Sequence, residues 1–484
     1  MASKLLHGDS SPLQMGQALR ESLPCSVLLP AGTGKTQLLV DTALSSSQTQ
    51  QSVLILTHTH AGVEAIKNRL RKQHVSLDRM TVQTIDSWCV QLIRFYPSIT
   101  GVRFETPDWS QSASYHSATT TLLSNPHIAS SIQQSYTFAL VDEYQDCLRE
   151  QHDLIVALNK IVKVGVFGDP LQSSITWGSN RQRLVDWSDE VESVFNPIGV
   201  DSYPWRWHES NPELGAWLLD IRERLSLGFS IDLRNSPVNW IEANPKNPSS
   251  ALYKAINALG LGSIAILGKY RPDCARAASL LRGEFSLMEE MQGKYMLNYA
   301  QLFDHGSAAT IAASTLQLAK DCANGIAGVF PSNKVHRLAE GKPILARDAT
   351  SKQSHQMLSL LLTEPTASIA RSALLSIQNL STFTLYCHEA WHCILNALEE
   401  LESNPTGSLQ DVVNKQRNEF RVAGRYTSQS VVSRPLLVKG LEFDHSILLS
   451  GSNYNAASLY VALTRGSKSV SVISPESTLN PSTY

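Results

Sequence analysis

Apolar runs near the N-terminus end in turn-forming or acidic stretches. "CSVLL" (residues 25–29) precedes a Gly-rich turn that leads into the helix-like stretch "QLLVDTAL", and "YTFALV" (136–141) ends in two adjacent acids. A short continuous apolar run bounded by such signals is typical of a buried strand. Both runs therefore predict strands whose C-terminal ends present residues that could bind a ligand or act in catalysis.

The hydrophobic pattern changes in the second half of the chain. Residues 263–282 predict a strand followed by a helix, whereas residues 286–428 lack strand-like alternation and are rich in Ala, Leu and Ser. Stretches such as "SAATIAASTLQLAKDCA" and "EAWHCILNALEELES" have the apolar spacing of helices. This part of the chain predicts a compact helical insertion.

Size and charge narrow the class of protein. At roughly 100–200 residues per domain, a chain of this length predicts two to four compact units. A composition of 42% hydrophobic and 17% charged residues suits a globular protein. A net charge of −2 gives no global positive field, so any contact with nucleic acid requires a local groove.

The cysteines and the N-terminal residues indicate the cellular compartment in which the protein works. The seven cysteines form no C-x-x-C pair, which argues against a disulfide framework or an iron–sulfur cluster and favours a reducing compartment. The N-terminus has no apolar signal core, and no uncharged apolar run of about 18 residues predicts a membrane span. We expect a cytoplasmic protein without membrane contact.

The turn after the first strand has the composition of a phosphate-binding loop. In "PAGTGKT", Gly32, Thr33 and Gly34 lie where backbone N–H groups would approach phosphate closely. Lys35 is placed to reach the β- and γ-phosphates of ATP, and the Thr36 hydroxyl to hold Mg²⁺. The alternative is a Gly-rich turn before an ordinary helix, which the flanking strand and helix disfavour.

The second strand delivers an acidic pair. Asp142 is placed to hold Mg²⁺, and Glu143 to polarise an attacking water, which is the chemistry of hydrolysis. Asp-Glu pairs are common on protein surfaces, but a pair that ends a buried strand downstream of a phosphate loop indicates function.

These stretches resemble the UvrD/Rep/PcrA type of superfamily 1 DNA helicase. Further segments similar to the family's motifs follow in the family's order: "LTHTHAGVEAIKNRL" (56–70), "TVQTIDSW" (81–88), "VGVFGDPLQSSITWG" (164–178), "YPWRWHESNPELGAWL" (203–218), "LLVKGLEFDHSILL" (436–449) and "LYVALTRGSKSV" (459–470).

The resemblance implies an α/β fold with two RecA-like P-loop NTPase cores, each a parallel sheet flanked by helices. ATP would lie in the cleft between the cores, and single-stranded DNA across both. It also implies the domain bounds, which are 1–87 and 134–200 for the first core, 88–133 for a short helical insertion, 201–285 and 429–484 for the second core, and 286–428 for a helical accessory insertion.

Several site residues follow from the resemblance alone. Gln172 would sense the γ-phosphate, and Arg206 and Arg465 would reach that phosphate from the second core as arginine fingers. Glu442 would contact the nucleotide's sugar region, and Gln14, or alternatively Gln17, would read adenine. Together with Glu143, the first three form the expected catalytic set.

The DNA-contacting residues are expected on the motif segments of both cores: Thr57, His58, Thr84, Trp177 and Lys439. Single-strand binding without sequence choice needs cations for phosphates and flat side chains for bases. The basic cluster at residues 67–72 could supply such cations. The alternative, a helix face exposed to solvent, explains the cluster equally well. His58 replaces the family's aromatic residue, and such departures fall mostly on DNA-contact or coupling positions.

The combined pattern predicts an ATP-dependent DNA helicase or translocase that moves on single-stranded or tailed duplex DNA. The family subtype implies 3′→5′ polarity, with ATP and Mg²⁺ as cofactors. An alternative is an ATP-gated DNA-binding sensor or regulatory subunit that works beside a partner nuclease or ATPase, as in Gabija-type phage defence. The altered DNA motifs and the short first insertion favour this alternative.

The stretch "HEAWH" (388–392) suggests a different enzyme. H-E-x-x-H on a helix is the signature of zinc metalloproteases, in which two His one turn apart hold zinc and the Glu acts as base. The apolar positions Trp391, Ile394, Leu395 and Leu398 read instead as the packed face of an ordinary helix. We expect a structural helix, with the metalloprotease as a minor alternative.

Overall fold

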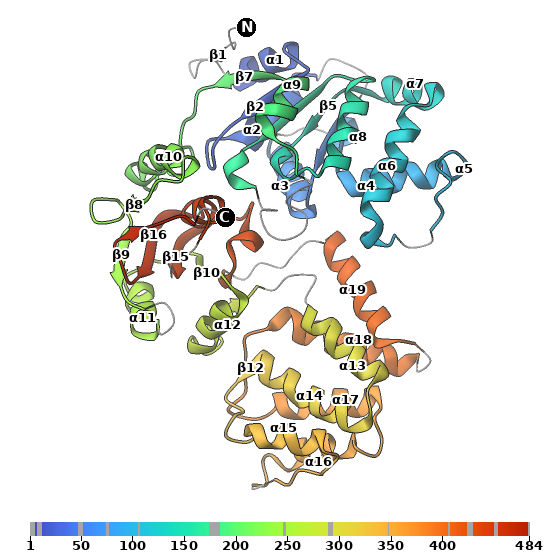
Figure 1. The fold of residues 1–484 in the computed structure, drawn as a ribbon, viewed down its shortest axis with the longest axis vertical. Helices are drawn as coiled ribbons and strands as arrows, with labels where there is room; N and C mark the ends of the chain where they lie inside the picture. The colour runs from blue at the N-terminus through green and yellow to red at the C-terminus, as the bar shows by residue number, and fades with distance from the viewer. Residues whose placement is uncertain are drawn as a thin grey trace.

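The computed structural model describes most of the chain, namely residues 5–6, 12–46, 52–73, 77–104, 107–173, 184–244, 248–288, 294–346, 348–404, 407–423, 429–449 and 454–482. Within these ranges, no helix is long and apolar enough to cross a membrane. Figure 1 shows the sheets of two α/β cores and a separate cluster of helices formed by the second half of the chain.

The first core is built on a seven-stranded parallel sheet in the order β1-β7-β2-β6-β5-β3-β4. Its strands are β1 (Leu5–Leu6), β2 (Cys25–Leu28), β3 (Ser52–Thr57), β4 (Met80–Thr84), β5 (Tyr136–Val141), β6 (Val164–Gly168) and β7 (Asn196–Val200). Because β2, β6 and β5 are neighbours and run parallel, their C-terminal ends meet at one edge of the sheet. The predicted phosphate loop and the acidic pair therefore lie together.

Helices cover both faces of this sheet, as α/β architecture requires. They are α1 (Pro12–Glu21), α2 (Lys35–Leu44), α3 (His60–Lys72), α4 (Ile85–Phe95), α8 (Arg149–Asn159) and the short α9 (Glu192–Val194). Helix α1 packs tightly on α2 at Gly16, where an added Cβ would lie only 2.3 Å from the Asp41 carbonyl oxygen. Between α4 and β5, the chain forms the small helical group α5 (Pro97–Thr100), α6 (Ser112–Leu123) and α7 (Pro126–Ser135).

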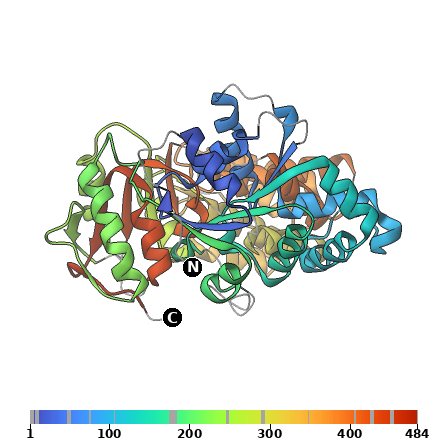
Figure 2. The same cartoon turned by 90° about the horizontal axis from the view of Figure 1, so that it is seen from above.

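The second core contains a six-stranded parallel sheet in the order β11-β14-β10-β15-β16-β9. Its strands are β9 (Asn239–Glu242), β10 (Ile264–Gly268), β11 (Ser286–Leu287), β14 (Ser430–Ser433), β15 (Phe443–Leu449) and β16 (Gly466–Ser474). Its helices are α10 (Pro212–Ser226), α11 (Ser249–Asn257), α12 (Arg271–Leu280) and α20 (Ala456–Leu463). The two parallel sheets with flanking helices confirm the expected α/β fold of two RecA-like cores (Figure 2).

A helical insertion separates β11 from β14. It comprises α13 (Lys294–His305), α14 (Ala308–Cys322), α15 (Ser332–Ala339), α16 (Lys352–Leu360), α17 (Ala367–Gln378), α18 (His388–Ser403) and α19 (Leu409–Ala423). Two short strands, β12 (Ala323–Asn324) and β13 (Thr384–Leu385), pair antiparallel within it, and a second short pair, β8 (Ile231–Asp232) with β17 (Thr478–Leu479), lies outside it.

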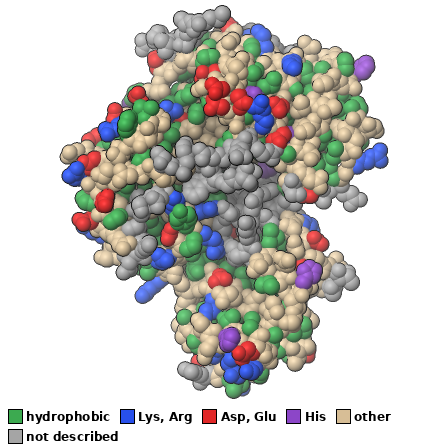
Figure 3. All heavy atoms as spheres, in the orientation of Figure 1, with side chains coloured by type: hydrophobic (Ala, Val, Ile, Leu, Met, Phe, Trp, Pro, Cys, Tyr) green, Lys and Arg blue, Asp and Glu red, His purple; other side chains and the backbone are tan. Residues whose placement is uncertain are grey.

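The insertion and one face of the second sheet share a single hydrophobic cluster. That cluster joins Ile266, Val432 and Ile447 of the sheet to buried residues of the insertion helices such as Leu374 and Trp391. Close packing of this kind fixes neighbouring elements relative to one another. The insertion is therefore built as an extension of the second core. Figure 3 shows acidic and basic side chains interspersed over the described part of the visible face.

The H-E-x-x-H stretch forms the first turns of α18. Trp391 is fully buried and its indole N–H donates to Gln378 Oε1 (2.9 Å), whereas His392 is exposed. Within the described ranges, no group of three or more His, Cys, Asp and Glu side chains could hold a metal ion. The arrangement supports the structural interpretation of this helix.

We expect Trp391→Ala to lower the free energy of unfolding by about 3–5 kcal/mol, because it empties a fully buried aromatic site. His392→Ala, on the exposed side of the same helix, should stay within about 0.5 kcal/mol of wild type. Chemical denaturation measures both. Zinc content should be negligible in the wild type, and stoichiometric zinc that disappears in His388→Ala would contradict the structural interpretation.

Candidate functional site

The loop between β2 and α2 has the backbone geometry of an anion cradle. Gly32 (φ 69°) and Gly34 (φ 91°) are in the left-handed region, and the Thr33 hydroxyl donates to the Pro30 carbonyl oxygen (2.8 Å). Lys35 begins α2 and is 8% exposed. Among the described residues its Nζ has no hydrogen-bond partner and lies 3.5 Å from Glu143 Oε2. A buried ammonium without a hydrogen bond fits a phosphate oxygen.

The acidic pair follows β5 directly opposite this loop. Asp142 Oδ2 accepts a hydrogen bond from the Thr36 hydroxyl (3.2 Å), and its Oδ1 accepts one from the Glu143 N–H (2.9 Å). Thr36 and Asp142 thus present adjacent oxygens, the ligand type that Mg²⁺ prefers. Burial and the neighbouring Glu143 charge raise the pKa of Asp142 above its usual range.

Glu143 is held in an uncommon backbone conformation, with φ 57° and ψ 36°. For a residue with a Cβ this left-handed conformation costs about 1–2 kcal/mol, and such strain clusters at functional sites. Burial acts to raise the pKa of Glu143, but Lys35 and Lys439 outweigh it and lower that pKa. The carboxylate is therefore kept ionised.

Lys439 reaches this carboxylate from the second core. It follows η7 (Pro435–Val438), and its Nζ lies 3.5 Å from Glu143 Oε2 and forms an ion pair with Asp146. All three groups are mostly buried. A residue expected to contact DNA is thus joined to the expected catalytic base.

The segment before α10 packs directly against the phosphate loop. The Arg206 N–H donates to the Gly32 carbonyl oxygen (3.1 Å). A Cβ at Gly32 would lie 2.5 Å from the Trp207 ring, and a Cβ at Gly34 would lie 3.2 Å from Trp205. Trp207 is fully buried, whereas Trp205 is 61% exposed beside the loop. The two cores therefore touch through the loop itself.

The two expected arginine fingers lie in one charged cluster with Glu442. The Arg206 guanidinium donates to Glu442 Oε1 (2.6 Å) and to the Thr464 carbonyl oxygen (2.7 Å). Arg465 is 2% exposed and donates to the carbonyl oxygens of Val461 (2.9 Å) and Leu441 (3.1 Å). Burial and the positive charge of Arg206 lower the pKa of Arg465 to about 9. A polyanion entering the cleft would relieve this repulsion.

Gln172 lies on η4 (Pro170–Gln172), the turn that follows β6. It is buried, and its side-chain N–H donates to Asp169 Oδ2 (2.9 Å). The Asp169 N–H in turn donates to Gln145 Oε1 (3.0 Å), and Gln145 donates to Glu143 Oε2. The expected γ-phosphate sensor is thus linked to the acidic pair through residues that the sequence did not single out.

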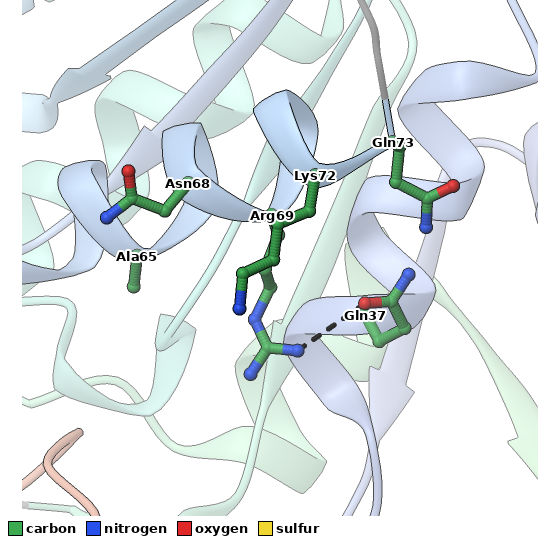
Figure 4. A pocket seen from close by; sticks show the side chains of 6 residues that line it. All are labelled: Gln37, Ala65, Asn68, Arg69, Lys72 and Gln73. Carbon is green, nitrogen blue, oxygen red and sulfur yellow. Dashed lines mark hydrogen bonds between the residues drawn. The ribbon is translucent and has the colours of Figure 1, made fainter.

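A groove of about 370 Å³ runs between α2 and α3 (Figure 4). It is lined by Gln37, Ala65, Asn68, Arg69, Lys72 and Gln73. Arg69 and Lys72 extend from α3 toward α2, where Arg69 donates to Gln37 Oε1 (3.4 Å). Gln37 lies two residues after Lys35 on α2, so the groove begins close to the phosphate loop. The basic cluster on α3 is thus divided between this groove and solvent.

The remaining residues are those expected to bind adenine or DNA. Gln14 is exposed on α1. Thr57 and Thr84 are buried, with the Thr84 hydroxyl capping α4 by accepting the Ser87 N–H (3.0 Å). His58 is half-buried, with Nε2 3.5 Å from Cys147 Sγ, and burial lowers its pKa. Trp177 lies outside the described residues.

A comparison with protein families agrees with the motifs of the first core. The family model of the UvrD/REP helicase N-terminal domain matches residues 13–114 and 108–183. This match confirms the resemblance to UvrD/Rep-type superfamily 1 helicases. A search of curated proteins finds no match.

Among solved structures, the complex of Arterivirus nonstructural protein 10 (helicase) with DNA is similar at 11% identity and a TM-score of 0.35. The alignment covers 96% of this chain and 63% of that one. The chain therefore spans less than two thirds of the length of that helicase.

We expect Gly32→Ala to destabilise the protein more than Gly101→Ala. Both glycines have positive φ, so each alanine adds about 1–2 kcal/mol of left-handed strain, but only the Gly32 variant also collides with Trp207. The collision should add about 1–3 kcal/mol. Chemical denaturation measures the difference, and equal losses in the two variants would contradict the described contact.

Proposed function

We propose that the chain is an ATP-dependent DNA helicase or translocase that moves on single-stranded DNA. The observation that carries this proposal is the contact across the cleft. The second core touches the phosphate loop through the Arg206 N–H, and the guanidinium groups of Arg206 and Arg465 both donate to Thr464. Loss of a γ-phosphate between such cores would change how they close, which is the basis of mechanical movement.

The geometry of the first core supports the proposed hydrolytic roles. The loop and Lys35 bind the phosphates, and Thr36 and Asp142 would hold Mg²⁺, which neutralises and orients the phosphates when bound. Glu143 accepts the proton of the attacking water. For this role, Glu143 must lose its ion pair with Lys439. Lys35, which also pairs with Glu143, would pair with the phosphates instead. Arg206 and Arg465 stabilise the negative charge that develops on the transferred group.

Trp205 and the α2–α3 groove would bind the sugar and base. Glu442 marks the sugar region in the family pattern, and the groove begins at Gln37, two residues after Lys35. Its lining supplies amide and guanidinium groups that match the polar edge of a base, and exposed Trp205 supplies a flat face beside Gly34. This assignment gives the base several contacts in addition to the expected Gln14.

DNA binding would control hydrolysis through Lys439. This residue is expected to contact DNA, together with His58, Thr57, Thr84 and Trp177. A DNA phosphate that draws Lys439 away from Glu143 and Asp146 would free the base for catalysis. The family subtype supports 3′→5′ polarity.

The ion pair between Glu143 and Lys439 also favours the alternative, an ATP-gated DNA sensor with little unwinding of its own. A strand-displacement assay on a 3′-tailed duplex separates the two functions, because robust unwinding by the isolated chain requires a motor. No observation on the described residues favours a partner nuclease or a role in phage defence.

We expect ATPase activity that single-stranded DNA stimulates at least about tenfold. Glu143→Gln should lower kcat by about 10²–10⁴-fold with little change in ATP binding, because it removes the base. Lys35→Ala should abolish nucleotide binding, whereas Lys160→Ala, at the exposed end of α8, should behave as wild type. Steady-state ATPase assays with DNA and RNA at two salt concentrations test this. The absence of stimulation by any nucleic acid would sink the proposal.

We expect Trp205→Ala to raise the KM for ATP by about tenfold or more, since stacking of a base on an aromatic side chain contributes about 1–3 kcal/mol. Trp205→Phe should retain most of the affinity. The kcat at saturating ATP should change little in both variants. Equal KM values for wild type and Trp205→Ala would remove Trp205 from the base-binding site.

A further inference from the structure

A buried ion pair joins the two cores away from the expected arginine fingers. Arg222 lies on α10 of the second core, and its guanidinium donates to Asp169 Oδ1 (2.6 Å) at the end of β6 in the first core. The Asp169 side chain is 0% exposed and that of Arg222 is 21% exposed. The motif pattern assigns no role to Arg222.

Asp169 is the centre of a hydrogen-bond network that faces the phosphate site. Its Oδ1 also accepts the Leu171 N–H (3.2 Å), and its Oδ2 accepts a side-chain N–H of Gln172 (2.9 Å). Its own N–H donates to Gln145, which donates to Glu143. Arg222 thus binds the carboxylate to which Gln172 donates, on the residue whose backbone N–H donates to Gln145.

The helix that packs on α10 also contacts the phosphate loop, because the Tyr460 hydroxyl on α20 accepts the Ala31 N–H (3.3 Å). Burial acts to lower the pKa of Arg222, but the Asp169 carboxylate and Tyr460 outweigh it and raise that pKa. Helix α20 packs against both α10 and η4. Arg222 therefore lies on a helix whose neighbour, α20, contacts both the phosphate loop and the Gln172 turn.

A purely structural ion pair is the ordinary interpretation, but it predicts a different outcome. Removal of Arg222 would leave Asp169 with neutral donors as its described partners. A buried carboxylate that loses its cation recruits other donors or gains a proton. Both changes would reorient Gln172 and Gln145, so the effect would reach the acidic pair and not only the stability of the interface.

We propose that Arg222 is a positioning residue for the hydrolysis of ATP, which holds Asp169 so that closure of the cores aligns Gln172 and Gln145 with the γ-phosphate and Glu143. This inference rests on the proposed function. Arg222 touches no reacting group itself and acts through Asp169. The α10 helix would thereby report the position of the second core to the catalytic turn of the first.

The test compares Arg222→Gln, Arg222→Lys and the control Arg224→Ala. Arg224 is on the same helix, is exposed, and donates to the Ser230 carbonyl oxygen (3.4 Å). Under saturating single-stranded DNA, Arg222→Gln should lower kcat at least about tenfold while the KM for ATP changes less than about twofold. Arg222→Lys should recover part of kcat, and Arg224→Ala should match wild type.

Asp169→Asn combined with Arg222→Gln should lower kcat no more than the larger single effect, because both act on one contact. A kcat of Arg222→Gln within about twofold of wild type would overturn the inference, as would an equal loss in Arg224→Ala. If the glutamine variant does not fold, Asp169→Asn alone decides, because it removes the charge that Arg222 pairs with. A lowered kcat at unchanged KM supports positioning, and a wild-type kcat overturns it.

Hydrogen exchange supplies a measurement that does not depend on activity. Backbone amides of residues 143–147 and 169–173 should exchange faster in Arg222→Gln than in wild type and Arg224→Ala. Unchanged exchange in both segments would overturn the inference. If the wild type hydrolysed no nucleoside triphosphate with any nucleic acid, the proposed function would fail, whereas this measurement would still decide whether Arg222 orders the two turns.

Discussion

The lack of a side chain at Gly32 is the constraint on which the cleft depends. Gly32 has a left-handed φ of 69°. Its missing Cβ leaves room for the Trp207 ring, which lies 2.5 Å from the position that an ideal Cβ would take. Only then can the Arg206 N–H reach the Gly32 carbonyl oxygen. A main-chain hydrogen bond of this kind fixes the distance between the cores more closely than flexible side chains could. The fully buried Trp207 anchors the segment by donating to the Gly466 carbonyl oxygen (2.8 Å).

Around this contact, cations of the second core face carboxylates of the first. Lys439 pairs with Glu143 and Asp146, and Arg222 pairs with Asp169. At an effective dielectric constant of about 20, two unit charges 4 Å apart interact by about 4 kcal/mol, so exchange of these partners is a strong lever on closure. A bound triphosphate would bring several negative charges into the same space and would compete for the same cations. The pairing pattern thus makes the position of the second core sensitive to what occupies the loop.

The sequence predicts the local parts of this arrangement and not the parts that depend on packing. Gly32, Gly34, Lys35 and the acidic pair are recognisable because one strand and one turn determine their geometry. The parallel sheets of both cores likewise follow from the family pattern, and the structure confirms them. Arg222 carries no such signal, since its partner is set only by the crossing of α10 over the first core. Thr57 and Thr84 show the converse, because short polar side chains after strands also serve as buried or capping groups.

The helical insertion extends this coupling beyond the cleft. Because it shares one hydrophobic cluster with the second sheet, a movement of the second core has to carry the insertion with it. Its last helix, α19, also contacts α3 of the first core. Helix α3 bears Arg69, which lines the groove beside α2. A rigid-body movement of the second core would therefore change the contact of α19 with α3, the helix that lines one side of the groove.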